Sequence, residues 1–206
     1  MEVDLLHYEK DLYKKGYRLI AGTDEVGRGP LVGPVVAAAV ILPPNYELIG
    51  LNDSKKLSEK KREQFYDIIM RDAISVGIGI VSETIIDEIN ILEASRLAMN
   101  NAIDDLKVAP DYILSDAMKL ERDVPVLPII HGDALSLTIA AASVIAKVTR
   151  DRLMVEFGQK YPEYEFEKHK GYPTKRHIEL VHKYGVLKEY RKTFKPISEM
   201  IKESSK

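Results

Sequence analysis

Residues 19–42 contain the feature that most constrains the fold: two apolar runs joined by a short glycine-rich segment. The first run ends at Ala21 and the second begins at Val35. Such runs are typical of buried strands, which we place at residues 18–23 and 35–42. The connection is too short for the crossover that parallel neighbours need, so we expect these two strands to be antiparallel.

The segment between the two expected strands combines acid with glycine. Asp24 and Glu25 follow the first strand, and Gly27 and Gly29 flank Arg28. Glycine lets the backbone approach a ligand closely and expose N–H groups that can bind an anion. Carboxylates beside such a loop indicate a site that binds metal ions and a phosphate group together. No Gly-Lys-Ser/Thr follows, so the loop is not a P-loop.

The rest of the chain alternates helical and extended patterns. We expect helices over residues 4–15, 58–70, 92–106, 133–161 and 174–184, and strands over residues 76–81, 112–114 and 126–130. Ser82 or Asn90 can start a further helix, and the chain past Pro196 has the pattern of a polar tail. This order of elements predicts an α/β architecture around a mixed sheet.

Two further acids occupy element ends. Asp116 ends a short apolar strand and Asp133 precedes the longest helical pattern. Taken singly, the first suits a turn and the second suits an N-cap. Several carboxylates at neighbouring strand ends would repel one another without cations. Oxygen ligands favour Mg²⁺ or Mn²⁺, and two such ions about 4 Å apart can activate water against a phosphodiester.

Charge and composition narrow the function. The 206 residues include 30 Lys+Arg and 32 Asp+Glu, a net charge of −2, so any nucleic-acid binding must use local patches. Three basic runs could form such patches: Lys55, Lys56, Lys60, Lys61 and Arg62; Lys147, Arg150 and Arg152; and Lys168, His169, Lys170, Lys175 and Arg176. The absence of cysteine excludes disulfides and Cys-based zinc sites. Without a long apolar run or a signal-peptide pattern, we expect a cytoplasmic protein with no membrane contact.

Four stretches, in order along the chain, resemble the type 2 ribonuclease H (ribonuclease HII) family. They are residues 24–30 (Asp-Glu-Val-Gly-Arg-Gly-Pro), 52–57 (Asn-Asp-Ser-Lys-Lys-Leu), 132–133 with 139–151, and 169–174 (His-Lys-Gly-Tyr-Pro-Thr). The resemblance implies the ribonuclease H-like fold, α/β with a central five-stranded mixed sheet flanked by helices. It implies one catalytic domain over residues 1–206, in which a small helical C-terminal region, about 162–206, contributes to substrate binding.

The resemblance also implies the site residues. The catalytic and metal-binding set, holding two Mg²⁺ or Mn²⁺ ions, maps to Asp24, Glu25, Asp116 and Asp133. The residues expected to contact nucleic acid are Gly27, Arg28, Gly29, Lys55, Ser143, Lys147 and Tyr172. The glycine-rich loop would bind the ribose 2′-OH, which distinguishes RNA from DNA, and Tyr172 would stack beside the junction.

The activity implied by the resemblance is metal-dependent endonucleolytic cleavage by a monomer. The expected substrates are the RNA strand of RNA/DNA hybrids and single ribonucleotides embedded in duplex DNA, cut on their 5′ side to leave 3′-OH and 5′-phosphate ends. This activity would remove ribonucleotides from DNA. The sequence departs from the family pattern at Ala117-Met118, where bacterial members commonly have Gly, and at His131, where Lys is common.

The residues alone leave alternatives open. A ribonuclease H-like nuclease of other specificity would cut an all-DNA duplex as well as a hybrid. A non-catalytic nucleic-acid-binding module has no use for buried carboxylates that repel one another, so convergence of the four acids separates it from an enzyme. Locally, residues 27–29 could be a tight turn, Tyr172 a surface aromatic, and Lys147 the partner of Asp151 one helical turn on.

Overall fold

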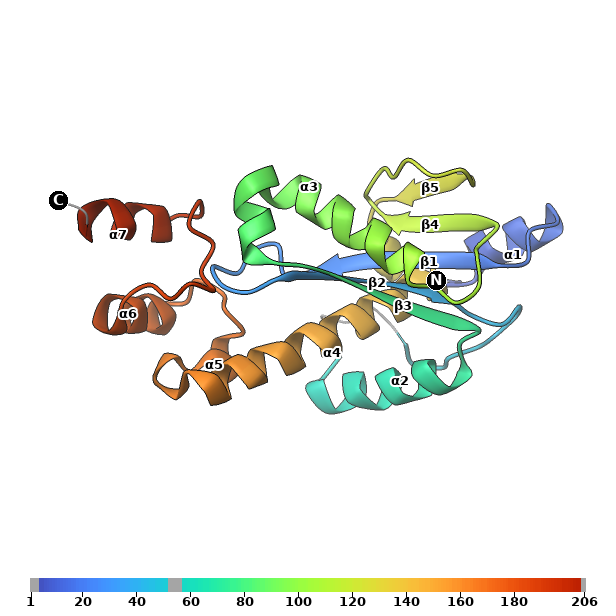
Figure 1. Ribbon diagram of the computed structural model, residues 1–206. Coiled ribbons are helices and arrows are strands. Elements are labelled where there is room, and N and C mark those ends of the chain that lie inside the picture. The colour runs from blue at the N-terminus through green and yellow to red at the C-terminus, as the bar shows by residue number, and fades with distance from the viewer. Residues whose placement is uncertain (1–3, 52–56, 205–206) are drawn as a thin grey trace.

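The computed structural model describes residues 4–51 and 57–204 and is built around one mixed sheet (Figure 1). The described strands are β1 (Ile20–Val26), β2 (Val35–Ile41), β3 (Ser75–Val81), β4 (Tyr112–Asp116) and β5 (Val126–Ile129). Their order in the sheet is β3-β2-β1-β4-β5. β2 pairs antiparallel with β1 and β3, whereas β4 runs parallel to β1 and β5. The predicted five-stranded mixed sheet and its antiparallel first pair are confirmed.

Helices cover both faces of this sheet. The described α-helices are α1 (His7–Lys14), α2 (Glu59–Asp72), α3 (Glu83–Asp104), α4 (Leu137–Lys160), α5 (Phe166–His169), α6 (Lys175–Tyr184) and α7 (Ile197–Ser204), with 3-10 turns η2 (Gly132–Ala134) and η3 (Pro162–Tyr164). α3 packs on one face, and α4 with α2 packs on the other (Figure 1). Every residue of β2 is therefore buried, as expected for a strand between two helical layers. No helix in the described ranges is both long and apolar enough to cross a membrane.

α4 lies unusually close to β1. A Cβ built on Gly22, in the middle of β1, would come within 2.2 Å of the backbone carbonyl carbon of Thr138. The helix presents the small side chains Ala140, Ala141 and Ala142 in the same layer. Such small side chains permit the close approach, which sets the first turn of α4 directly on the central strand.

Side-chain caps fix most of the helix starts. The side chains of Ser58, Ser82 and Thr174 accept hydrogen bonds from the backbone N–H groups three residues on, which ends the preceding loop and starts α2, α3 and α6. Both candidate starts of α3 are used, because its helix is interrupted at Asn90 (φ 70°), whose side chain accepts from Leu92 and Glu93.

The prediction that the long helix begins at Asp133 is wrong. α4 begins at Leu137, and its cap is Ser136, whose hydroxyl accepts from the N–H of Ile139. Asp133 instead lies in the short turn η2. Its carboxylate is therefore released from the N-cap role that its sequence position allowed.

The C-terminal region, residues 162–204, packs beside the loop between β1 and β2. Leu31 and Val32 of that loop share an apolar cluster with Tyr164 and Tyr190, and Val32 forms a β-bridge with Tyr190. The prediction of a polar tail past Pro196 is wrong, because α7 buries Ile197 in the same cluster. The C-terminal region therefore packs against both the loop between β1 and β2 and the last part of α4 (Figure 1).

Candidate active site

Three strand and turn ends bring the predicted acids together. In the parallel pair of β1 and β4, Thr23 is opposite Ser115, so Asp24 and Asp116 each come one residue later at the same end of the sheet. β1 is longer than predicted and continues to Val26, because Glu25 and Val26 still pair with β2. Asp133 reaches the same edge from η2, which follows β5.

The carboxylates of Asp24, Asp116 and Asp133 form one group, here called the carboxylate cluster. One oxygen from each lies within 4.8 Å of the others. Asp24 and Asp133 are buried, and Asp116 is partly buried. The N–H of Gly132 donates to Oδ1 of Asp116 at 2.7 Å, which ties the turn carrying Asp133 to β4. Three hard oxygen donors at this spacing suit Mg²⁺ or Mn²⁺.

Glu25 lies beside the cluster but is not one of its three members. Side chains alternate between the faces of a strand, so Glu25 leaves β1 on the side opposite Asp24. Its Oε1 accepts from Nη1 of Arg28 at 3.3 Å. Its Oε2 is buried and has no hydrogen-bond partner among the described residues. A buried carboxylate oxygen without a donor fits a site completed by a cation.

The electrostatics of the site also fit a cation. Burial, followed by the charges of Glu25, Asp116 and Asp133, raises the pKa of Asp24 well above its usual range. Burial is also the main reason that the pKa of Glu25 is raised, although the Arg28 guanidinium opposes this effect. Divalent ions would remove the repulsion that makes these groups hard to ionise.

The glycine-rich loop, residues 27–29, uses its two glycines differently. Gly27 has a φ of +96°, and a Cβ there would lie 2.3 Å from Nε of the buried Arg150 side chain. The missing side chain of Gly27 therefore makes room for the Arg150 side chain and not for a ligand. Among the described residues, a Cβ at Gly29 would meet only the Tyr172 ring, at 3.5 Å. Gly29 and the partly exposed ring of Tyr172 thus lie together on the surface, as their proposed shared role requires.

Two stacked histidines hold the turn that carries Tyr172. The rings of His169 and His177 lie 4.0 Å apart. Nδ1 of His177 lies 2.8 Å from the carbonyl oxygen of Tyr172, and its Nε2 lies 2.8 Å from the hydroxyl of Tyr190. Burial lowers the pKa of His177 to about 4, so the ring is neutral at physiological pH and donates to the Tyr172 carbonyl.

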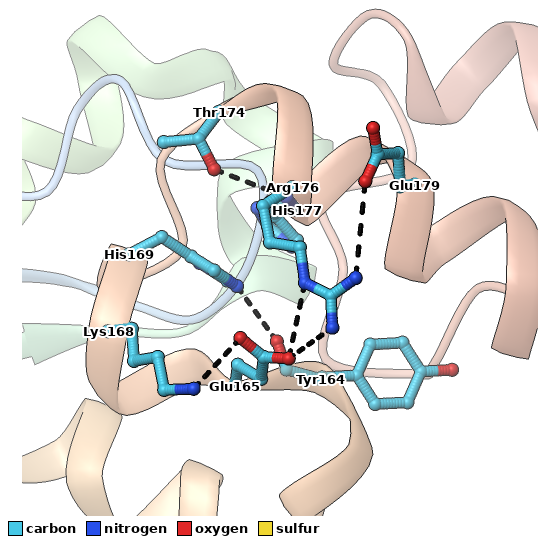
Figure 2. A network of polar contacts seen from close by, with 8 residues as sticks. All are labelled: Tyr164, Glu165, Lys168, His169, Thr174, Arg176, His177 and Glu179. Carbon is cyan, nitrogen blue, oxygen red and sulfur yellow. Dashed lines mark hydrogen bonds and ion pairs between the residues drawn. The ribbon is translucent and has the colours of Figure 1, made fainter.

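An ion-pair network surrounds this turn (Figure 2). Glu165 accepts from Lys168 at 3.1 Å and also binds the guanidinium of Arg176, while His169 contacts the carbonyl oxygen of Tyr164. These two cations belong to the third basic run of the sequence. Their pairing with Glu165 leaves them less free to bind phosphate than the run alone indicated.

The other residues predicted to contact nucleic acid are buried or paired in the structure, or lie outside its described ranges. Ser143 is buried in α4. The Lys147 ammonium pairs with Asp151 at 2.6 Å, and burial lowers the pKa of Lys147. Lys55 lies outside the described residues. Arg150, a member of a basic run that could form a local patch, is instead fully buried, and its guanidinium donates to backbone carbonyls.

The departure at Ala117 carries a conformational cost. Ala117 follows Asp116 with a φ of +50°, a left-handed conformation that glycine adopts more readily than alanine. Ala117→Gly should therefore raise the free energy of unfolding by about 1 kcal/mol, measured by urea denaturation. Ala109→Gly, in an exposed loop position without positive φ, should lower it. A loss of stability in the Ala117 variant would show that this strain is absent.

The fold is shared with solved ribonucleases H. The ribonuclease H2 from Pyrococcus horikoshii OT3 matches with a TM-score of 0.80 and 28% identity, over 91% of this chain and 99% of that one. The ribonuclease HII of the PCNA complex from Archaeoglobus fulgidus matches with a TM-score of 0.73 and 25% identity, over 86% and 95%. Fold and buried acids together define a hydrolase of the ribonuclease H class, which acts on nucleic acid.

Sequence comparison narrows this class to one family. The family model for ribonuclease HII matches residues 21–197. The ribonuclease HII of Bacillus cytotoxicus is 58% identical over 200 residues, which cover 97% of this chain and 77% of the relative. That of Bacillus anthracis is 58% identical over 201 residues, covering 98% and 78%. The chain belongs to the ribonuclease HII family and is an endonuclease of the ribonuclease H type.

Proposed function

We propose that this protein cuts the RNA strand of RNA/DNA hybrids and the 5′ side of single ribonucleotides in duplex DNA, leaving 3′-OH and 5′-phosphate ends. The observation that carries the proposal is the convergence of Asp24, Asp116 and Asp133 within 4.8 Å at one sheet edge. The glycine-rich loop leaves β1 directly beside this cluster. A site for phosphodiester hydrolysis and a backbone suited to sugar recognition are therefore neighbours.

The roles assigned to the acids follow from their surroundings. Asp24, Glu25, Asp116 and Asp133 would hold two Mg²⁺ or Mn²⁺ ions, as the all-carboxylate donor set allows. Such ions, when bound, lower the pKa of an attacking water and stabilise the leaving oxygen. The chain's own contribution is to fix the carboxylates: the N–H of Glu25 donates to Asp24 at 2.7 Å, and the N–H of Gly132 donates to Asp116 at 2.7 Å.

Recognition of the ribonucleotide would use the surface formed by Gly29 and Tyr172. The backbone at Gly29 is exposed, so it can approach a 2′-OH without a side chain in the way. The Tyr172 ring, whose backbone carbonyl is held by His177, can stack on the sugar or base of the next nucleotide. Stacking of this kind contributes roughly 1–3 kcal/mol per base.

Tyr172→Ala should reduce cleavage at a single embedded ribonucleotide more than cleavage of a continuous RNA strand, because only the first substrate presents a junction to the ring. Gly29→Ala should impair both, since both need the 2′-OH contact. Initial rates on the two duplexes at fixed salt and Mg²⁺ measure the difference. Equal fractional losses for Tyr172→Ala would leave that residue a packing role only.

The proposal as a whole is tested with three duplexes of one sequence: a hybrid, an all-DNA duplex, and a DNA duplex with one ribonucleotide. We expect cleavage of the hybrid and of the single-ribonucleotide duplex in Mg²⁺ or Mn²⁺, and none in EDTA. The all-DNA duplex should stay intact under every condition. Cleavage of all-DNA would identify a nuclease of other specificity, and cleavage in EDTA would remove the metal from the reaction.

A further inference from the structure

Arg191 is a fully buried cation whose hydrogen bonds within the described chain all go to backbone carbonyls, while its guanidinium lies over the ring of Phe194. Its Nη2 donates to the carbonyl oxygen of Gly27 at 2.6 Å, its Nη1 to that of Arg28 at 3.0 Å, and its Nε to that of Gly33 at 3.0 Å. No carboxylate in residues 4–51 and 57–204 forms an ion pair with it. Burial lowers the pKa of Arg191 to about 9, so it remains charged at neutral pH.

The planarity of the peptide bond turns this contact into a directional constraint. In a trans peptide the carbonyl and the following N–H point in opposite directions. The peptides of this loop are trans. Because Arg191 draws the carbonyls of Gly27 and Arg28 inward, the N–H groups of Arg28 and Gly29 must point away from the protein interior. Both residues are exposed, and neither amide donates a hydrogen bond within the described structure.

Two consecutive outward amides are a binding element for an oxygen atom. Successive backbone N–H groups of this kind form concavities that hold anions and other acceptors. On one side the loop follows Asp24 and Glu25 at the end of β1. On its other side lies the Tyr172 ring, which is 3.5 Å from the Cβ position of Gly29. An oxygen bound by these amides would thus sit between the acids and the aromatic ring.

Arg150 supplies a natural comparison. It is equally buried and donates to the carbonyls of Val32, Pro34 and Lys170. The amides that follow two of these carbonyls are already used: Gly33 N–H donates to Glu189, and Gly171 N–H donates to His169. Arg150 therefore has the same chemistry and burial but exposes no amide pair.

We propose that Arg191 is a positioning residue for sugar selectivity, which holds two carbonyls inward so that the amides of Arg28 and Gly29 face the ribose 2′-oxygen of the bound strand. The inference rests on the proposed function, because that function places a ribose at this loop. Arg191 does not touch the substrate; it acts through the backbone. A residue of the C-terminal region would thus set how well the enzyme distinguishes ribose from deoxyribose.

The test compares wild type, Arg191→Lys and Arg150→Lys. Both substitutions keep the charge and remove the forked donor geometry at a fully buried position. The measured quantity is the ribose preference, the ratio of dissociation constants for an all-DNA duplex and the same duplex with one ribonucleotide, by fluorescence anisotropy in EDTA. We expect Arg191→Lys to lower this ratio about tenfold, since misdirected amides lose their hydrogen bonds to the 2′-oxygen. Arg150→Lys leaves the three hydrogen bonds of Arg191 in place, so it should lower the ratio far less, although Arg150 also packs against Gly27.

The outcomes separate the inference from the function on which it rests. Wild-type protein without a ribose preference would contradict ribose recognition at this loop altogether. A wild-type preference that Arg191→Lys retains would overturn the positioning role alone. An equal loss of ribose preference in both variants would also overturn it, because replacing any buried arginine would then have the same effect. Urea unfolding of each variant establishes that folded proteins are compared.

If Arg191→Lys does not fold, the amides themselves decide the question in the wild-type protein. Backbone ¹⁵N–¹H resonances of Arg28 and Gly29 should shift more with the single-ribonucleotide duplex than with the matching DNA duplex. The amide of Gly33, which is already hydrogen-bonded to Glu189, serves as the internal reference. Equal shifts of the Arg28 and Gly29 amides with both duplexes would contradict the proposal.

Discussion

Asp24→Asn is expected to reduce the rate of RNA cleavage in Mg²⁺ by roughly a thousandfold or more. Asparagine keeps the size of the side chain but removes the charge that a divalent ion requires. Asp116→Asn should have a similar effect, although its oxygen can still accept the hydrogen bond from Gly132. Single-turnover cleavage of a hybrid duplex measures both losses.

Asp24→Asn should also leave the metal-free fold intact or more stable. Burial and the neighbouring acids raise the pKa of Asp24, so its ionisation costs folding free energy, and stability falls as the pH rises from the unfolded-state pKa to the folded-state pKa. The substitution removes that loss. In wild type, added Mg²⁺ should raise the melting temperature, and it should do so much less in the variant.

Asp111→Asn is the matched control for these variants. Asp111 precedes β4 at the end opposite Asp116 and accepts hydrogen bonds from the backbone of Arg18 and Leu19. Its substitution should cost some stability but leave cleavage close to the wild-type rate. Near-normal cleavage by Asp24→Asn, or a collapse of cleavage in Asp111→Asn, would contradict the assignment of the carboxylate cluster.

Gly22→Ala should be among the most destabilising single-methyl changes in the protein. The added Cβ would lie 2.2–2.5 Å from backbone atoms of Thr138 and Ile139, and backbone cannot rotate away as a side chain can. We expect the free energy of unfolding to fall by about 3 kcal/mol or more. Because Gly22 precedes Asp24 by two residues and α4 follows Asp133, displacement of α4 should weaken metal binding too.

Gly29→Ala provides the comparison for stability, since within the described ranges a Cβ there meets only the Tyr172 ring, at an ordinary contact distance. Its free energy of unfolding should stay close to that of wild type, as measured by urea denaturation. A similar small change in Gly22→Ala would show that α4 can move from β1 without loss, and would remove the close approach as an organising feature of the fold.

Strand positions and the main acids were accessible from sequence because apolar runs mark buried strands. Asp24 and Asp116 could be assigned to strand ends by that pattern. The helix at Ile197–Ser204 was missed although Ile197, Met200 and Ile201 stand at helical spacing, because the polar residues of this short segment were given more weight than that pattern. The start of α4 was also misplaced. Both Asp133 and Ser136 are residue types that cap helices, and only the structure shows that Ser136 is the cap.

Buried arginines were the largest gap in the sequence-based account. Arg150 was placed in a basic run that could form a surface patch, whereas charged residues that are fully buried are rare. Nothing in the sequence near Arg191 indicates that its partners are carbonyls more than 150 residues away. Such contacts depend on tertiary structure, and no local pattern predicts them.

The central claim is that the carboxylate cluster and the glycine-rich loop together cut next to a ribonucleotide, and mapping the cleaved ends tests it most directly. A duplex with one ribonucleotide, labelled at either end of that strand, is incubated with the protein in Mg²⁺. We predict one cut, on the 5′ side of the ribonucleotide, leaving a 3′-OH and a 5′-phosphate. Cuts on its 3′ side, cuts elsewhere in the DNA, or a 2′,3′-cyclic phosphate end would contradict the account.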